Sequence, residues 1–246
     1  MLDKHRWAAP VLPLLVYMAV GSLEPSPGKP GAAAIGLALP YAAYPLLYTL
    51  KIGLTLAAIA LVWRGYPPLP RRPSAWAMLL GALGVVVWIG LWKLQLDRKI
   101  LQALGLGRLA NYFLELGARP AFNPLEQLAD WPGWARAFLA ARFLGLVAVV
   151  PVIEEMFLRG FLMRFVMAPD WWNVPVGKVN AAAVAVSVLL PAMTHPAEIL
   201  PAMVWFGMIT WLMVRTRSLW DCVAAHAVTN LLLGIYVVTT GQWTLW

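Results

Sequence analysis

Long apolar runs separated by short polar segments constrain this chain more than any other feature. Apolar residues make up 61% and charged residues 12% of its 246 residues, whereas soluble domains average about 25% charged residues. Several runs are long enough to cross a bilayer core of about 30 Å as helices. Because backbone groups in lipid must be hydrogen-bonded internally, such runs form helices. We therefore predict an all-α, polytopic transmembrane helix bundle of about seven to eight spans, with residues 1–246 as a single integral membrane domain.

The apolar runs locate the individual spans. Many of the fourteen tryptophans, such as Trp63 and Trp220, lie at run ends and fit an interfacial aromatic belt. The fourth run is long, and Pro151 is expected to kink it. The first run lacks a small-residue cleavage site, so we expect a retained helix rather than a removed signal. The expected spans cover residues 7–23, 41–63, 75–92, 134–166, 179–194, 200–214 and 219–238.

Residues 93–133 form one long polar interval. Its first part, KLQLDRKILQALGLGRLANYFLELG, has apolar residues at helical spacing with charges between them. We expect an amphipathic helix lying in the membrane interface, with a marginal eighth span as the alternative. The following segment ARPAFNPLEQLADWPG contains three prolines and is expected to be a loop.

The positive charge of the chain indicates orientation rather than nucleic-acid binding. The net charge is +8, and the basic residues form short clusters between apolar runs. Such clusters usually mark cytoplasmic loops, and their distribution favours a cytoplasmic N-terminus. The long interval, expected outside, breaks this rule because it carries Lys93, Arg98, Lys99, Arg108 and Arg119. An interfacial helix accounts for the exception.

A pair of carboxylates interrupts the fourth apolar run in the stretch PVIEEMFLRGFLMR. A charge inside a spanning helix costs about 2.5–3.5 kcal/mol on insertion scales, so it usually faces the protein interior and has a function. Glu155 and Arg159 are four residues apart and share a helix face, whereas Glu154 is rotated by about 100°. Arg159 can therefore hold Glu155 ionised, and Glu154 can act as the chemical group. The alternative is that the Glu155–Arg159 pair has a purely structural role and holds two helices together.

Polar groups in two later spans fall at a similar depth. Counting from the cytoplasmic ends, Glu154, His195 and His226 lie roughly 13–23 Å into the membrane. Asn230 shares a face with His226 in the sequence HAVTN. A carboxylate and a histidine can together deprotonate a water. A second histidine and an amide can stabilise the oxyanion formed when that water attacks a carbonyl. The set is suited to peptide hydrolysis without a covalent intermediate.

Other chemistries use the same residues. Glu154, His195 and His226 are ligand types for zinc, although the chain lacks an HExxH sequence. Cys222 lies four residues before His226 and can in principle form a thiol dyad, whereas a buried cysteine is more often a small apolar residue. A proton-coupled transporter can use intramembrane carboxylates and histidines, but no repeated halves are visible. We interpret Glu198 and Asp221 as interfacial charges.

Two motifs resemble those of a protease family. EEMFLR resembles the Glu-Glu-x-x-x-Arg motif of the CAAX-protease and bacteriocin-processing (CPBP, Abi) superfamily of intramembrane proteases. RTRSLWDCVAAHAVTN is similar to the final motif of that family, which ends in His-x-x-x-Asn. The middle motif of the family is Phe-x-x-x-His, and Pro191 stands at the aromatic position before His195. The resemblance covers roughly residues 138–238.

The resemblance implies an assignment of roles. Glu154 and His195 would activate water, His226 and Asn230 would form the oxyanion site, and Glu155 and Arg159 would support them. Residues 134–238 would form the catalytic core, with no cofactor and no metal. VPVIEEMFLRGFLMR and HAVTNLLLGIYVVTTGQW also resemble a bacterial subgroup associated with exosortase/PEP-CTERM sorting systems, which implies the bacterial inner membrane.

Two classes of function follow from these patterns. The first is a membrane-embedded glutamate-type endopeptidase that acts on a membrane-anchored or lipidated protein or peptide and binds no nucleic acid. The second is a non-catalytic membrane scaffold or sorting accessory that keeps the polar cluster for helix packing. Substitution of Glu154 distinguishes them.

Overall fold

The computed structural model describes residues 6–70, 72–117 and 121–246, and its regular structure there is helical. Residues 1–5, 71 and 118–120 lie outside the described residues. They include Lys4, Arg71 and Arg119, three of the basic residues whose distribution predicts the orientation, and the first three residues of the expected loop. The predicted all-α class is confirmed. The α-helices are α1 (Ala8–Gly21), α2 (Tyr44–Val62), α3 (Ala75–Leu94), α4 (Leu96–Ala103), α5 (Gly107–Leu116), α6 (Pro124–Gln127), α7 (Pro132–Leu144), α8 (Val150–Phe157), α9 (Met163–Phe165), α10 (Ala181–Met193), α11 (Ile199–Thr216) and α12 (Leu219–Thr240).

Five helical segments of the described chain are long and apolar enough to cross a membrane. They cover Tyr41–Gly65, Ala75–Ala103, Pro132–Phe165, Pro196–Thr216 and Leu219–Thr240. Two shorter apolar helices, Ala8–Gly21 and Ala181–Thr194, occupy the positions of the first and fifth predicted spans. The seven segments therefore correspond to the seven apolar runs.

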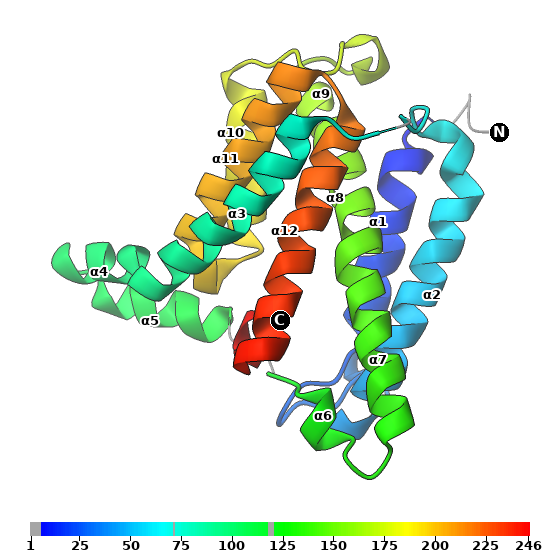
Figure 1. The fold of residues 1–246 in the computed structure, drawn as a ribbon, viewed down its shortest axis with the longest axis vertical. Coiled ribbons are helices and arrows are strands. Elements are labelled where there is room, and N and C mark those ends of the chain that lie inside the picture. The colour runs from blue at the N-terminus through cyan, green and yellow to red at the C-terminus, as the bar shows by residue number, and fades with distance from the viewer. Residues whose placement is uncertain (1–5, 71, 118–120) are drawn as a thin grey trace. The chain divides into compact units, whose positions relative to one another are not determined.

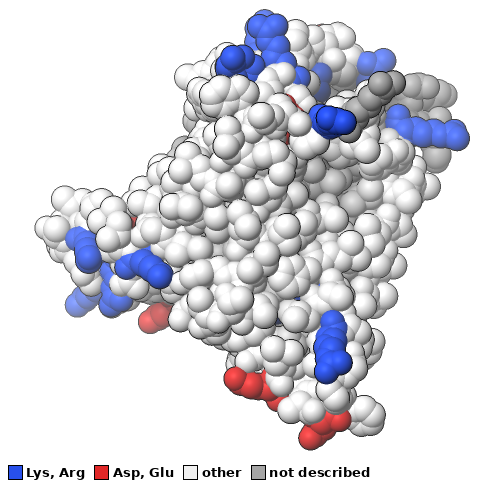
Figure 2. Space-filling model, in the orientation of Figure 1, with Lys and Arg blue, Asp and Glu red and all other residues white. Residues whose placement is uncertain are grey.

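The first part of the interval after α3 contains two short helices, α4 and α5, instead of one amphipathic helix. The expected loop that follows contains a further short helix, α6, which begins at Pro124. The chain turns between α4 and α5 at Gly105, whose φ of +76° is a left-handed conformation that glycine adopts at little cost. The sequence signal for this turn is LGLG, residues 104–107. Figure 2 shows lysine and arginine side chains gathered on the α4–α5 hairpin. The hairpin keeps the predicted amphipathic character, and its place at a membrane interface stays a prediction.

The fourth helical segment changes its hydrogen-bonding pattern twice. The π-helical turns η4 (Gly145–Val149) and η5 (Leu158–Leu162) flank α8. Pro151, which we expected to kink the helix, is the second residue of α8 and lies two residues after the end of η4. Its ring would clash with the carbonyl of residue 147 in an α-helix, and residue 147 lies within the wider π-turn. Such turns are frequent at functional sites.

Contacts divide the chain into two compact units. Unit 1 comprises Met1–Pro68, Pro120–Phe157 and Gly234–Trp246, and unit 2 comprises Leu69–Arg119 and Leu158–Leu233. The helical segment 132–165 therefore passes from unit 1 to unit 2 after Phe157, and α12 returns to unit 1 at Gly234.

Unit 1 is built on α1, α2 and the α7–α8 segment, which lie side by side (Figure 1). Its core is aromatic: the ring of Phe138 on α7 contacts the rings of Tyr44 and Tyr48 on α2 at centroid distances of 5.9 and 5.8 Å. Gly145 lets α2 approach closely, because a Cβ atom there would lie 2.5 Å from the Tyr48 hydroxyl. Aromatic packing thus fixes α2 against α7.

Unit 2 packs α11 between α3 and α10 (Figure 1). The first part of α12 contacts α3 at Gly81, where a Cβ atom would lie 2.7 Å from the carbonyl oxygen of Ala225. Small residues at such contacts let membrane helices approach closely. The unit places α3, α11 and α12 around the two histidines.

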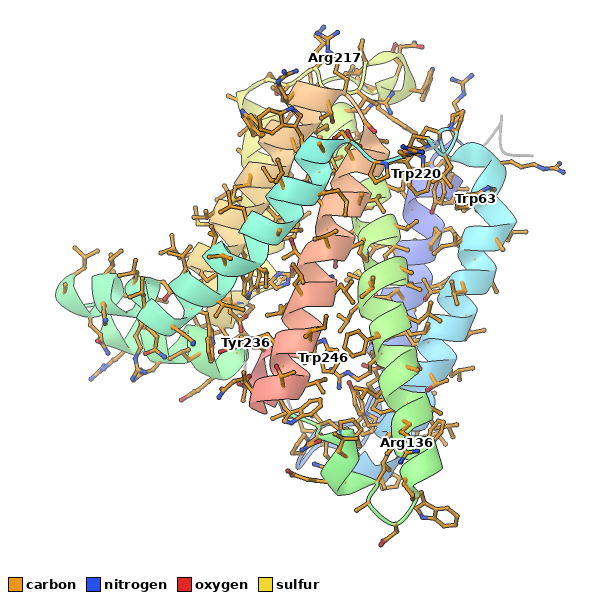
Figure 3. The ribbon with its side chains drawn as sticks, viewed as in Figure 1. Trp63, Arg136, Arg217, Trp220, Tyr236 and Trp246 are labelled. Atoms are coloured by element: carbon orange, nitrogen blue, oxygen red, sulfur yellow. The ribbon has the colours of Figure 1, made fainter. Side chains whose placement is uncertain are left out.

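The tryptophans at run ends do not all have one role. Trp63 is 45% exposed, as expected for an interfacial ring, whereas Trp220 is 8% exposed (both labelled in Figure 3). Trp220 therefore packs within the protein, contrary to the prediction of a lipid-facing belt residue.

Candidate functional site

Phe206 on α11 is a common neighbour of three predicted site residues in unit 2. Its ring centroid lies 6.0 Å from the ring of His195 and 6.4 Å from the ring of His226. The guanidinium carbon of Arg159 lies 5.7 Å from the same ring. Residues from η5, the end of α10 and α12 thus meet one side chain of α11. Unit 2 brings Arg159, His195 and His226 together.

His195 follows the last turn of α10 and is held by that turn. Its Nδ1 lies 2.8 Å from the carbonyl oxygen of Pro191 and 3.2 Å from the hydroxyl of Thr194. Because a carbonyl oxygen only accepts, Nδ1 must carry the proton. Nε2 is then the nitrogen that can accept a proton in the neutral ring. This is the tautomer that a general base with an oriented ring requires.

Pro191 stands where the Phe-x-x-x-His pattern has an aromatic residue, and aromatic rings from other helices lie beside His195 instead. The Trp88 ring on α3 lies 5.7 Å from His195 at an interplanar angle of 80°, and Phe206 contacts it from α11. Aromatic rings from other helices thus flank the histidine. The Nε1 of Trp88 is buried and has no hydrogen-bond partner among the described residues.

His226 is buried on α12 with 5% exposure. The Trp205 ring lies 4.6 Å away and nearly perpendicular, at 70°. The indole N–H of Trp205 donates to the Thr229 hydroxyl at 3.2 Å, and that hydroxyl donates to the carbonyl of Gly81 at 2.8 Å. This network fixes the indole and therefore one wall of the histidine. Asn230 is half-buried one turn further along α12.

Arg159 is fully buried and connects three elements. Its Nη2 donates to the carbonyl oxygen of Phe206 at 3.0 Å and to the Thr210 hydroxyl at 3.3 Å. The Thr210 hydroxyl lies 3.0 Å from the Ser187 hydroxyl on α10. Hydrogen bonds to a charged donor are stronger than neutral ones, so this network ties η5 to α11 and α10. It holds the backbone of Phe206 in place.

Glu154 and Glu155 lie on α8, in unit 1. Glu155 is fully buried and Glu154 is half-buried. Glu154 is electrostatically coupled to Tyr17 of α1, and α1 packs against α8. Two of the six predicted residues thus belong to one unit and four to the other. The pairing of Glu155 with Arg159, and the assembly of Glu154 with the histidines, stay predictions.

The alternative zinc and thiol chemistries depend on where the His, Cys, Asp and Glu side chains lie. Among the described residues there is no group of three or more His, Cys, Asp or Glu side chains placed to hold a metal ion. The Cys222 thiol is fully buried and donates to the Ser218 carbonyl at 3.4 Å. Cys222 has the environment of a small packing residue.

Two predicted interfacial charges are buried instead. Glu198 is 4% exposed and Asp221 is 5% exposed. Asp221 accepts a hydrogen bond at 2.9 Å from the backbone N–H of Ser74, which precedes α3. The carboxylate therefore joins the beginnings of α12 and α3, a role that hydropathy does not reveal.

Sequence reasoning missed a second buried charge cluster, in unit 1. Lys51 on α2 pairs with Glu24 at 2.8 Å, and Arg142 on α7 is 5% exposed. Both cations lie inside predicted spans. The rule that singled out Glu154, that an intramembrane charge indicates function, applies equally to them.

Comparison with known proteins finds one similarity, in the C-terminal half of the chain. Residues 136–232 match a protein-family model described as "Rce1-like: Type II CAAX prenyl endopeptidase Rce1-like". The match covers less than half of the chain and includes the six predicted site residues. No curated protein and no solved structure matches the chain. The segment is thus similar to a domain of a protease family, as the two motifs predict.

Proposed function

We propose that this chain is an intramembrane endopeptidase that hydrolyses a peptide bond in a membrane-associated or lipidated protein. The observation that carries the proposal is the meeting of Arg159, His195 and His226 on Phe206. The match to the type II CAAX prenyl endopeptidase model supports the reaction class. The tautomer of His195 set by Pro191 supports a role as proton acceptor.

In the proposed reaction, Glu154 and His195 hold and deprotonate a water molecule. The water oxygen attacks the peptide carbonyl carbon, and the carbonyl oxygen becomes an oxyanion. His226 and Asn230 donate hydrogen bonds to that oxyanion. The abstracted proton then passes to the leaving amine as the C–N bond breaks. Glu155 and Arg159 position the residues that react.

The membrane setting is part of the proposal. We infer that the five long and two shorter apolar helices all cross the bilayer, with the α4–α5 hairpin at the interface. The bacterial inner membrane is the proposed location, and an exosortase-type sorting system is the proposed partner. Genes for such a system next to the gene for this chain would support the partner, and their absence across related genomes would oppose it.

Substitution of Glu154 tests the mechanism. We expect Glu154→Gln to lower the turnover of a prenylated peptide by about 10²–10⁴-fold, because the base is lost. The measurement is peptide cleavage in proteoliposomes, with product masses recorded. Glu126→Gln, which changes an exposed carboxylate on α6, is the matched control and should keep full activity. Unchanged turnover in a correctly inserted Glu154→Gln protein would falsify the mechanism.

Further variants separate the reaction from its alternatives. Asn230→Ala should lower kcat by about 10²–10³-fold if its amide stabilises the oxyanion. Cys222→Ala and added chelators should leave turnover unchanged. Loss of activity with a chelator would favour the zinc mechanism, and loss in Cys222→Ala would favour the thiol mechanism.

A non-catalytic scaffold is the second candidate, and the Arg159 network favours it. Arg159 bonds to Phe206 and Thr210 as a purely structural helix lock would. A scaffold predicts no cleavage of any membrane peptide and an unchanged membrane proteome in cells carrying Glu154→Gln. Accumulation of an uncut membrane protein in those cells would exclude it.

A further inference from the structure

The indole N–H of Trp88 on α3 is a buried donor that no part of the proposed reaction uses. Trp88 is 7% exposed, and its Nε1 has no hydrogen-bond partner among the described residues. Most buried side-chain donors in proteins are hydrogen-bonded, because a buried donor without an acceptor loses its bonds to water and gains none in return. The Trp88 N–H is therefore suited to binding an acceptor from outside the protein.

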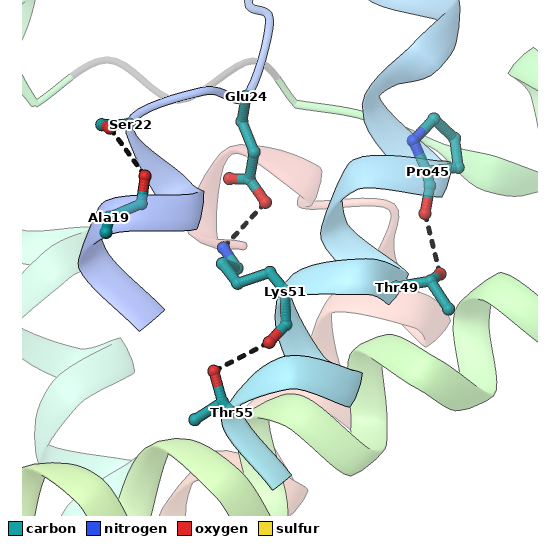
Figure 4. Close-up of polar contacts among 7 residues, drawn as sticks. All are labelled: Ala19, Ser22, Glu24, Pro45, Thr49, Lys51 and Thr55. Carbon is teal, nitrogen blue, oxygen red and sulfur yellow. Dashed lines mark hydrogen bonds and ion pairs between the residues drawn. The ribbon is translucent and has the colours of Figure 1, made fainter. Parts of the chain in front are cut away.

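Other buried donors of the chain have acceptors within the protein. In unit 1, Lys51 pairs with Glu24 at 2.8 Å (Figure 4). In unit 2, the Trp205 indole N–H donates to the Thr229 hydroxyl at 3.2 Å. Trp205 is 2% exposed, so the two tryptophans match in residue type, unit and burial. They differ in that the described residues supply an acceptor to Trp205 and none to Trp88.

Trp88 lies beside the proposed base of the site. Its ring centroid is 5.7 Å from that of His195, with the ring planes at 80°, and 6.3 Å from that of Trp205. Gly81 and Gly84 lie on the same face of α3, the face that packs against α11 and α12. A separation of 5.7 Å is about two hydrogen-bond lengths, so one oxygen atom bound at the ring edges can contact both Trp88 and His195.

We propose that the Trp88 indole N–H binds the oxygen of the water molecule that is activated for peptide hydrolysis, and this proposal rests on the proposed function. In the proposed reaction the two hydrogens of the water point to Glu154 and His195, which leaves two lone pairs on its oxygen. The indole N–H donates to one lone pair, and the other attacks the carbonyl carbon of the peptide. Because an indole N–H only donates, Trp88 orients the water without competing for its proton.

The hydrogen bond from Trp88 becomes stronger as the water reacts. One O–H bond of the water breaks, its proton passes to the Glu154–His195 pair, and the oxygen forms a bond to the carbonyl carbon. Trp88 keeps its own proton throughout. Negative charge develops on the water oxygen as the proton leaves, and a hydrogen bond to a charged acceptor is stronger than one between neutral groups. The bond therefore stabilises the transition state more than the resting water.

An isosteric replacement of the indole nitrogen tests this role. Trp88→benzothienylalanine, introduced into the full chain by codon suppression, replaces the N–H with sulfur and keeps the bicyclic ring. We expect kcat for a prenylated peptide in proteoliposomes to fall about 10- to 100-fold. KM should stay unchanged, because the bond orients the water and not the substrate. The same replacement of Trp76, which is 47% exposed on the same helix, is the matched control and should leave both constants unchanged.

The two kinetic constants separate the roles that Trp88 can have. A higher KM with unchanged kcat would show that the N–H binds the substrate instead of the water, and would overturn the proposal. Unchanged kcat and KM would show that the ring only packs against His195, and would overturn it as well. Thermal unfolding in detergent shows whether each variant is folded. Trp88→Phe also removes the N–H and should lower kcat in the same way.

A spectroscopic measurement tests the water contact without requiring cleavage. In the full chain labelled with ¹⁵N at the tryptophan indoles, the Trp88 N–H should show a strong NMR cross-peak to a bound water, assigned by its absence in Trp88→Phe. The Trp205 N–H, which bonds to Thr229, is the internal control and should show a weaker one. A Trp88 cross-peak no stronger than that of Trp205 overturns the proposal even if the chain cleaves peptides. A strong Trp88 cross-peak in a chain that cleaves no peptide supports the water site and opposes the proposed function.

Discussion

Thr210 joins the buried guanidinium of Arg159 to α10. Its hydroxyl accepts from Arg159 Nη2 at 3.3 Å and lies 3.0 Å from the Ser187 hydroxyl. It also donates to the Phe206 carbonyl at 2.8 Å, which accepts from Arg159 as well. The hydroxyl therefore supports the residue on which both histidines pack.

The Thr210 network gives a prediction for stability. Thr210→Val keeps the shape of the side chain but leaves Arg159 with one acceptor fewer, so we expect a loss of about 1–3 kcal/mol in the free energy of unfolding. Thermal or denaturant unfolding in detergent measures it. Thr216→Val is the control, since among the described residues the Thr216 hydroxyl bonds only to Leu212 of its own helix. Equal losses in the two variants would show that the Arg159 bond contributes nothing.

Single residues also show what the sequence could and could not reveal. Glu154, Arg159, His195 and His226 stand out because polar groups are rare in apolar runs. Phe206 and Trp205, which surround the histidines, look like ordinary apolar positions in such a run. Their role depends on which helices are neighbours, and hydropathy does not contain that information.

Among the helices, α3 owes its position to two glycines. A Cβ atom at Gly84 would lie 2.6 Å from Trp205 Nε1 and 2.8 Å from the Thr229 hydroxyl. Gly81 faces α12 in the same way. Close approach of α3 is therefore required for the bond between Trp205 and Thr229, and that bond holds the ring beside His226.

Substitution of Gly84 tests this dependence. Gly84→Ala should destabilise the protein by about 1–3 kcal/mol through overpacking, and it should lower turnover because Trp205 must move. Gly90→Ala on the same helix meets nothing within 4 Å and should be neutral or stabilising by up to about 1 kcal/mol. Unfolding curves and peptide cleavage are the measurements. If the Gly84→Ala protein is as stable and as active as the Gly90→Ala protein, α3 does not need Gly84 for its close approach to Trp205 and Thr229.

The helix boundaries were predicted better than the internal irregularities. The predicted span 219–238 agrees closely with α12, whereas η4 and η5 were missed. Apolar periodicity over a few residues does not separate i→i+4 from i→i+5 bonding. The turn at Gly105 was missed because apolar residues continue on both sides of it.

Across the whole chain, the charge pattern and the lengths of the apolar runs predict the membrane topology more firmly than they predict the arrangement of the site. The seven apolar segments follow from composition, but the assignment of Glu154 to unit 1 and of His195 to unit 2 does not. That division depends on packing between segments far apart in sequence. Sequence motifs indicate which residues act together, and only packing shows which elements hold each of them.

The predicted topology can be tested by cysteine labelling, because Cys222 is the sole cysteine and is fully buried. In a Cys222→Ala background, a membrane-impermeant maleimide should label Lys29→Cys and Gln102→Cys in intact spheroplasts. It should label Arg215→Cys only after permeabilisation, since Arg215 belongs to a basic cluster expected inside. All three positions are exposed, so labelling reports the side of the membrane. One outcome would contradict this topology: Lys29→Cys is labelled from outside, but Gln102→Cys, like Arg215→Cys, is labelled only after permeabilisation. In that case α4 does not lie on the outer side, and the orientation derived from the distribution of basic residues is wrong.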